Sequence, residues 1–253
     1  MCGITGFSLK TNLNQKENVL RIMNDKLSHR GPDGEGFYHD DDVSFAHKRL
    51  AIIDLNSRSN QPFFDKKKEY VIVFNGEIYN FIELKKILTD EGFVFFTSSD
   101  TEVLLNSYIK WGIGLLQKIK GMFSFAIYDK KRKQILCARD HFGQKPFFYY
   151  YNDGNFIFSS ELTSLISNPQ IKKEICIKSI INYLHYDSFV GDSTPLNNCY
   201  KLLPSEYLIF DIEKREITKK IYWNLNISKH KHYPKDYYDL FMNKLIISTK
   251  QHL

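Results

Sequence analysis

The feature that most constrains the fold is a succession of short apolar runs separated by tight turns. The runs are rich in aromatic and β-branched residues, which favour strands. Their connections include Asn152-Asp153-Gly154-Asn155, a hairpin signal that predicts antiparallel pairing. The predicted strands cover residues 3–9, 43–46, 50–53, 70–75, 123–129, 134–140, 147–151, 156–159, 208–211 and 216–221.

Segments with apolar residues at helical spacing lie between and around these runs. They cover residues 18–27, 81–88, 101–111, 161–166 and 177–186. Two clusters of antiparallel strands with helices around them predict a layered α+β fold. Past Trp223 the composition shifts to Asn, Ser, Lys and His, and helical spacing returns near the end. We expect one domain over residues 1–212, a linker over 213–236, and the first helix of another domain over 237–253.

Charge and cysteine content exclude several classes of protein. The net charge is +6, and the lysine clusters at 66–68, 130–133 and 229–235 are typical of solvated turns, not of a nucleic-acid surface. The cysteines are Cys2, Cys137, Cys176 and Cys199. Their spacing and that of the histidines fit no metal site, and four are too few for a disulfide scaffold. No secretory signal or membrane-spanning run is present, so we expect a soluble cytoplasmic protein without a membrane partner.

The first chemical signal is Cys2, which directly follows the initiator methionine. Removal of Met1 would leave Cys2 with a thiol and a free α-amine, whose reference pKa is about 7.7–8.0. One residue would then supply both a nucleophile and a general base. Because the predicted strand starts at Gly3, it would hold Cys2 rigidly. The alternative is that a cysteine at position 2 is incidental.

The second signal is Asn75-Gly76, at the end of an apolar strand. An Asn amide beside a Gly backbone N–H can stabilise an oxyanion during acyl transfer. Glycine also lets the backbone approach a substrate closely. A plain Asn-Gly hairpin turn is the alternative interpretation.

Three charged residues suit the two ends of a free amino acid. Arg49 leads into an apolar run, and an arginine entering a pocket suits bidentate capture of a carboxylate. Glu77 and Asp100 could together hold an ammonium group. The alternatives are a surface arginine, a solvated Glu77, and an Asp100 that merely caps the helix after it.

Taken in order, these segments resemble the N-terminal glutaminase domain of glutamine-hydrolysing asparagine synthetase, a class II amidotransferase with an N-terminal nucleophile. His29-Arg30-Gly31-Pro32-Asp33 and the stretch from Arg139 to Pro146 indicate this branch. The matching stretches are residues 1–7, 29–34, 49–54, 75–80, 98–103, 121–129, 139–148 and 158–165.

The resemblance implies the fold of the N-terminal nucleophile (Ntn) hydrolases, a four-layer αββα sandwich of two antiparallel sheets. It also implies that Cys2 attacks the side-chain amide of L-glutamine and that Asn75 and Gly76 form the oxyanion hole. Arg49 would bind the α-carboxylate and Glu77 with Asp100 the α-amino group. Backbone around Leu50, Ile52 and Ile53 would line the pocket. Arg30 and the Gly-Pro-Asp turn would lie beneath the site as support.

The sequence departs from full synthetases because it contains no Ser-Gly-Gly-x-Asp-Ser loop for ATP. We therefore expect no cofactor in this chain, with ATP and Mg needed only in a C-terminal synthetase domain or a separate synthetase subunit. A fragment, a natural truncation and a subunit all fit, and a homodimer is compatible. Three alternatives are an acceptor other than aspartate (a sugar acid, for example), a catalytically idle domain, and a self-processing peptidase. The last is disfavoured because nothing but Met1 precedes Cys2.

Overall fold

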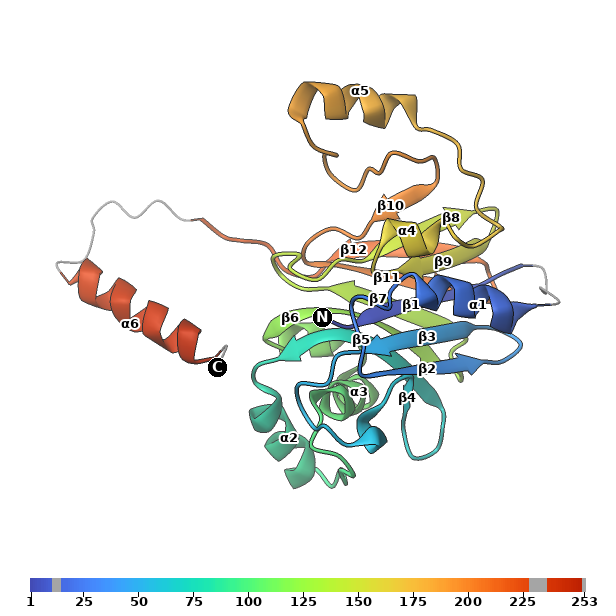
Figure 1. Ribbon diagram of the computed structural model, residues 1–253. Helices are drawn as coiled ribbons and strands as arrows, with labels where there is room; N and C mark the ends of the chain where they lie inside the picture. Colours follow the sequence, from blue (N-terminus) through green and yellow to red (C-terminus); the bar gives the residue numbers. More distant parts are fainter. Residues whose placement is uncertain (11–14, 228–235, 252–253) are drawn as a thin grey trace.

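The computed structural model describes residues 1–10, 15–227 and 236–251, and its strands form two six-stranded antiparallel sheets (Figure 1). In the first sheet the order is β10-β8-β9-β1-β3-β2. Its strands are β1 (Gly3–Ser8), β2 (Gly34–His39), β3 (Ser44–Arg49), β8 (Phe148–Asn152), β9 (Asn155–Ser159) and β10 (Cys199–Lys201).

In the second sheet the order is β12-β11-β7-β6-β5-β4. Its strands are β4 (Phe63–Phe64), β5 (Tyr70–Ile78), β6 (Gly121–Asp129), β7 (Gln134–Arg139), β11 (Glu206–Asp211) and β12 (Glu216–Ile221). The longest pairing joins β5 to β6 along nine residues, from Tyr70 opposite Asp129 to Ile78 opposite Gly121.

Three apolar clusters show that the molecule has four layers. The central cluster lies between the sheets, where Phe45 of β3 packs with Val73 of β5. A second cluster covers the outer face of the first sheet with α1 (Lys16–Asp25) and α4 (Leu162–Leu165). A third covers the outer face of the second sheet with α2 (Phe81–Asp90) and α3 (Asp100–Trp111). The αββα sandwich that the resemblance implied is therefore confirmed.

Two helices stand away from this sandwich (Figure 1). The first is α5 (Ile177–Tyr186), which exposes Ile177, Ile181 and Leu184. The second is α6 (Tyr237–Lys250), which has no buried residue. Two short 3-10 helices, η1 (Ser57–Ser59) and η2 (Gly112–Gln117), lie in connections.

Most of the predicted strands and helices are confirmed to within a few residues, and so are the turns at lysines 66–68 and 130–133. The lysine cluster at 229–235 and part of the predicted linker lie outside the described residues. The short strands β2, β4 and β10 were not predicted.

The strand predicted over residues 50–53 is wrong. The backbone N–H of Leu50 points to Cys2 Sγ at 3.4 Å, and that of Ala51 donates to Asp33 Oδ2 at 2.8 Å. Both N–H groups are therefore used by side chains, and the chain leaves the sheet after Arg49. This departure creates the loop that carries the site described next.

Candidate active site

Cys2 directly precedes β1, one of the two central strands of its sheet. The next residue begins β1, which pairs with β3 on one side and with β9 on the other. The Cys2 thiol lies 3.6 Å from the carbonyl oxygen of Leu50 and 3.4 Å from its backbone nitrogen. Arg30 Nε donates to the Cys2 carbonyl at 3.0 Å, and Arg30 Nη1 donates to Glu161 Oε1 at 2.9 Å. The thiol is thus held by Leu50, and the Cys2 backbone by an arginine whose side chain is 9% exposed.

Burial raises the pKa of the Cys2 thiol, while the Leu50 hydrogen bond, the chain's α-ammonium group and Arg49 lower it by smaller amounts. With its pKa raised, the thiol needs a nearby base to become a thiolate at neutral pH. In the described chain the α-amine belongs to Met1, which lines the same pocket as Cys2. Only removal of Met1 gives Cys2 an α-amine of its own.

A pocket of about 200 Å³ opens on the thiol. It is smaller than the ~300–1,000 Å³ of pockets for drug-sized ligands, which suits a ligand the size of an amino acid. The structure brings every residue proposed for the site into its lining: Cys2, Arg49, Leu50, Ile52, Ile53, Asn75, Gly76, Glu77 and Asp100.

Asn75 and Gly76 lie inside β5, opposite Ser124 and Phe123 of β6. They do not form the hairpin turn that was the alternative interpretation. Asn75 is 1% exposed, and neither its Nδ2 nor its Oδ1 has a hydrogen-bond partner in the described protein. A Cβ at Gly76 would come within 2.2 Å of the Met122 carbonyl oxygen, so this position requires glycine. A buried amide without a partner is free to donate to a ligand in the pocket.

Arg49 is a fixed cation. Its Nη1 donates to Asn56 O at 3.0 Å and to Asn60 Oδ1 at 2.6 Å, and its Nη2 donates to Asp54 O. All three acceptors are uncharged, and Arg49, which is 7% exposed, forms no ion pair with a described residue. A buried guanidinium with neutral partners can attract a carboxylate into the pocket.

Asp100, the first residue of α3, provides the opposite charge. It is 5% exposed, and its Oδ2 accepts a hydrogen bond from Ile78 N at 3.0 Å. Burial, opposed by that bond and reinforced by nearby Glu77, raises the pKa of Asp100 to about 6. Asp100 is therefore largely ionised at neutral pH and can bind a cation together with Glu77.

Several pocket residues escaped the sequence analysis. Lys145 is 7% exposed, and burial lowers its pKa. Gln61 joins β5 to α3, because its Oε1 accepts from Phe74 N at 2.6 Å and its Nε2 donates to Thr101 Oγ1 at 3.3 Å. Both residues precede a proline, and this was the sole local signal that could have singled them out.

No group of three or more His, Cys, Asp or Glu side chains in the described ranges is arranged to hold a metal ion. Over the same ranges, no helix combines the length and the apolar character needed to cross a bilayer. The pocket brings together a thiol, an amide donor with no partner in the described protein, and groups of opposite charge.

The chain matches the protein family described as "Glutamine amidotransferase domain" over residues 1–223. It belongs to that family. This assignment agrees with the geometry of the pocket, in which a thiol lies with groups suited to an amino acid.

Similar proteins agree with this assignment. A Methanocaldococcus jannaschii protein with the provisional name asparagine synthetase (glutamine-hydrolysing) 2 is 38% identical over 245 residues, which is 89% of this chain and 47% of that protein. Asparagine synthetase (glutamine-hydrolysing) 3 of Bacillus subtilis is 37% identical over 237 residues, which is 91% of this chain and 38% of that protein. The chain thus spans less than half the length of these relatives.

Among solved structures, glutamine phosphoribosylpyrophosphate amidotransferase from B. subtilis aligns with a TM-score of 0.64 at 20% identity. The alignment covers 89% of this chain and 50% of the other. At this identity the likeness establishes the fold alone.

Proposed function

We propose that this chain hydrolyses the side-chain amide of L-glutamine through a Cys2 thioester, giving glutamate and ammonia. One observation carries the proposal: a single small pocket holds a half-buried thiol, an amide with no partner in the described protein, and opposite charges. Membership of the glutamine amidotransferase domain family is consistent with it.

The reaction starts once Met1 has been removed. The α-amine of Cys2 accepts the thiol proton, and the sulfur attacks the side-chain carbonyl carbon of glutamine. Asn75 Nδ2 and the backbone N–H of Gly76 donate to the oxyanion, each contributing about 3–4 kcal/mol by comparison with similar sites. The proton passes to the departing nitrogen, ammonia leaves, and water hydrolyses the thioester of Cys2.

Substrate recognition in this proposal uses the two charged ends of the pocket. Arg49 binds the α-carboxylate, and Asp100 with Glu77 binds the α-ammonium group. Backbone at Leu50 and at Ile52 and Ile53 lines the space between them. A ligand that lacks one of the two charged groups would leave Arg49 or Asp100 unpaired. An unpaired buried charge is costly in binding free energy.

We further propose that the chain is the ammonia-supplying half of an asparagine synthetase. The names of the relatives and the partial coverage of their length support this assignment. In this proposal residues 1–212 form the glutaminase domain, 213–236 a linker, and 237–253 the first helix of a synthetase domain. ATP and Mg would bind only that further domain or a separate synthetase subunit, and the glutaminase would need no cofactor. A homodimer and a cytoplasmic location are part of the same proposal.

The decisive experiment incubates the chain with glutamine and, separately, with a diazo-ketone analogue of glutamine. We expect glutamate release and an adduct located on Cys2 by mass spectrometry, both lost in Cys2→Ala. Cys176→Ala is the matched control, because Cys176 lies outside the pocket and hydrogen bonds from Ser179 lower its pKa. Glutamate release that survives Cys2→Ala would refute the thioester mechanism. A chain without Met1 that yields neither product nor adduct would be catalytically idle.

A further inference from the structure

Asp54 lies in the loop that follows Arg49 and Leu50. It contacts Arg49 at one end of the pocket and, at the other end, Ser98, which lies two residues before Asp100. Its backbone oxygen accepts a hydrogen bond from Arg49 Nη2. Its side-chain Oδ2 accepts a hydrogen bond from Ser98 N at 2.8 Å, across 44 residues of sequence. Asp54 has φ +49, a left-handed conformation in which Asp and Asn are enriched among non-glycine residues. This conformation lets the carbonyl and the carboxylate of one residue reach different partners.

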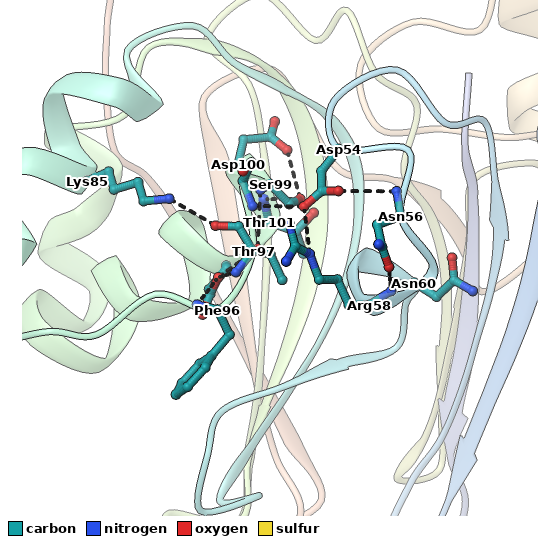
Figure 2. Close-up of polar contacts among 12 residues, drawn as sticks. Asp54, Asn56, Arg58, Asn60, Lys85, Phe96, Thr97, Ser99, Asp100 and Thr101 are labelled. Atoms are coloured by element: carbon teal, nitrogen blue, oxygen red, sulfur yellow. Dashed lines mark hydrogen bonds and ion pairs between the residues drawn. The ribbon is translucent and has the colours of Figure 1, made fainter.

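Ser98 leads directly to the anionic end of the pocket. Ser99 Oγ accepts from Thr101 N at 3.1 Å and so caps α3, whose first residue is Asp100. The preceding residues are held from the other side by Glu102, which is 4% exposed and accepts from Thr97 N at 2.7 Å. Asp54 therefore links the loop that follows Arg49 to the residue before this cap. Figure 2 shows Asp54 between Asn56 on one side and Ser99 and Asp100 on the other.

The Asp54 carboxylate uses both oxygens as acceptors. Oδ1 accepts from Asn56 N at 3.1 Å, and Oδ2 lies 3.5 Å from Arg58 Nε as well as 2.8 Å from Ser98 N. The Ser98 hydrogen bond is the main reason why the pKa of Asp54 falls to about 2. An asparagine there would have one acceptor oxygen and would direct an NH₂ group at an N–H donor.

The simpler alternative is that Asp54 has a purely structural role and only stabilises its own turn. Asp211 does so in the hairpin between β11 and β12, where its Oδ1 accepts from Glu213 N at 3.1 Å and Lys214 N at 2.9 Å. A third contact, from Gln134 Nε2 to Asp211 Oδ2 at 3.4 Å, reaches only the paired strand β7, which does not line the pocket. Asp54 differs because its partners belong to two separate segments, and each segment carries one charged end of the pocket.

We propose that Asp54 is a positioning residue that sets the separation between Arg49 and Asp100, so that a ligand must carry both an α-carboxylate and an α-ammonium group to bind well. This inference rests on the proposed glutaminase function. Asp54 itself does not line the pocket and acts through the two residues it connects.

The test compares Asp54→Asn with Asp211→Asn as the matched control, using two amide substrates. L-Glutamine has both charged ends, and 4-carbamoylbutanoate lacks the α-amino group. For Asp54→Asn we expect KM for glutamine to rise at least about 10-fold, the lower range for losing a hydrogen bond to a charged group, with kcat changed less than about 2-fold. Binding of 4-carbamoylbutanoate uses only Arg49 and does not depend on the separation between Arg49 and Asp100. Its kcat/KM should therefore change less than about 3-fold. Asp211→Asn should leave both substrates unaffected.

Alkylation of Cys2 by iodoacetamide provides a measurement that does not depend on substrate recognition. Its rate should be the same in the parent chain and in Asp54→Asn. If Asp54→Asn does not fold, Asp54→Ser, which retains one acceptor, replaces it with the same expectation. Equal losses of kcat/KM on both substrates, a fall in kcat alone, or no change in KM for glutamine would each overturn the inference. A parent chain without Met1 that does not hydrolyse glutamine would instead overturn the proposed function.

Discussion

Replacing Asn75 by alanine is expected to lower activity and to raise stability. Asn75 is 1% exposed, and both polar atoms of its side chain lack partners in the described protein. Each buried polar group without a hydrogen bond costs about 1–3 kcal/mol, and alanine removes two of them. Part of this gain is offset by lost packing, so we expect the free energy of unfolding to rise by roughly 1–2 kcal/mol.

The same substitution removes the proposed oxyanion donor. We expect kcat for glutamine to fall by about 10²–10³-fold, or about 2.7–4 kcal/mol in the activation barrier. KM should change little, because the oxyanion forms only during reaction. Glutamate release and urea unfolding, measured on the same preparation, test the two parts together.

Asn168→Ala is the matched control. Asn168 is also fully buried, but its Oδ1 accepts from Gln170 N at 3.0 Å and its Nδ2 donates to Met23 Sδ at 3.4 Å. Its loss should lower stability by about 1–3 kcal/mol and leave kcat unchanged. If Asn75→Ala were destabilised as much as Asn168→Ala, the reasoning from an unpartnered amide would be wrong. A kcat within 10-fold of the parent would remove Asn75 from the oxyanion hole.

Three further predictions concern the same pocket. A preparation whose intact mass includes Met1 should release no glutamate, because the α-amine of Cys2 is then part of a peptide bond; activity at that mass would contradict the proposed base. Because the pKa of Asp100 is raised to about 6, KM for glutamine should increase as pH falls from 7.5 to 5.5, whereas Asp100→Asn should give a high KM that varies little with pH. The raised pKa also means that the folded protein holds this proton at pH values where the unfolded chain has lost it. The contribution of Asp100 to stability should therefore fall as pH rises from about 4 to about 6, and urea titrations should show that Asp100→Asn gains stability relative to the parent chain over this range. Glu161→Gln should lower kcat about 10-fold at constant KM, because Arg30 loses its ion pair with Glu161 and holds Cys2 less firmly. A change in KM alone would count against this supporting role of Glu161.

Local sequence patterns were sufficient to predict secondary structure where each strand pairs with the next strand in sequence. The alternation and the turns of residues 121–159 predicted four strands, because each of these strands pairs with a neighbour in sequence. Asn75-Gly76 shows the limit of such patterns. The dipeptide favours a turn, yet it lies within a nine-residue pairing, whose backbone hydrogen bonds outweigh that preference.

Contacts between distant segments could not be predicted. Residues 50–53 have the composition of a strand, but the Cys2 thiol and the Asp33 carboxylate take the N–H groups of Leu50 and Ala51. Lys145 and Asp54 reach the region of the pocket from segments whose sequence spacing to Cys2 carries no information. The nine proposed pocket residues could be named because the family resemblance supplied an arrangement that periodicity does not contain.

The position of β1 has a consequence for the order of events during synthesis. Thr5 pairs with Ser159, and the Ile4 N–H donates at 3.0 Å to Ser160 Oγ, 156 residues further along the chain, so β1 is completed by a strand that is made later. At about 5–20 residues per second, a ribosome needs roughly 8–30 s to reach that partner. During this interval Cys2 has no fixed neighbours on the β9 side. A nascent chain should therefore be unable to release ammonia until most of the domain has emerged.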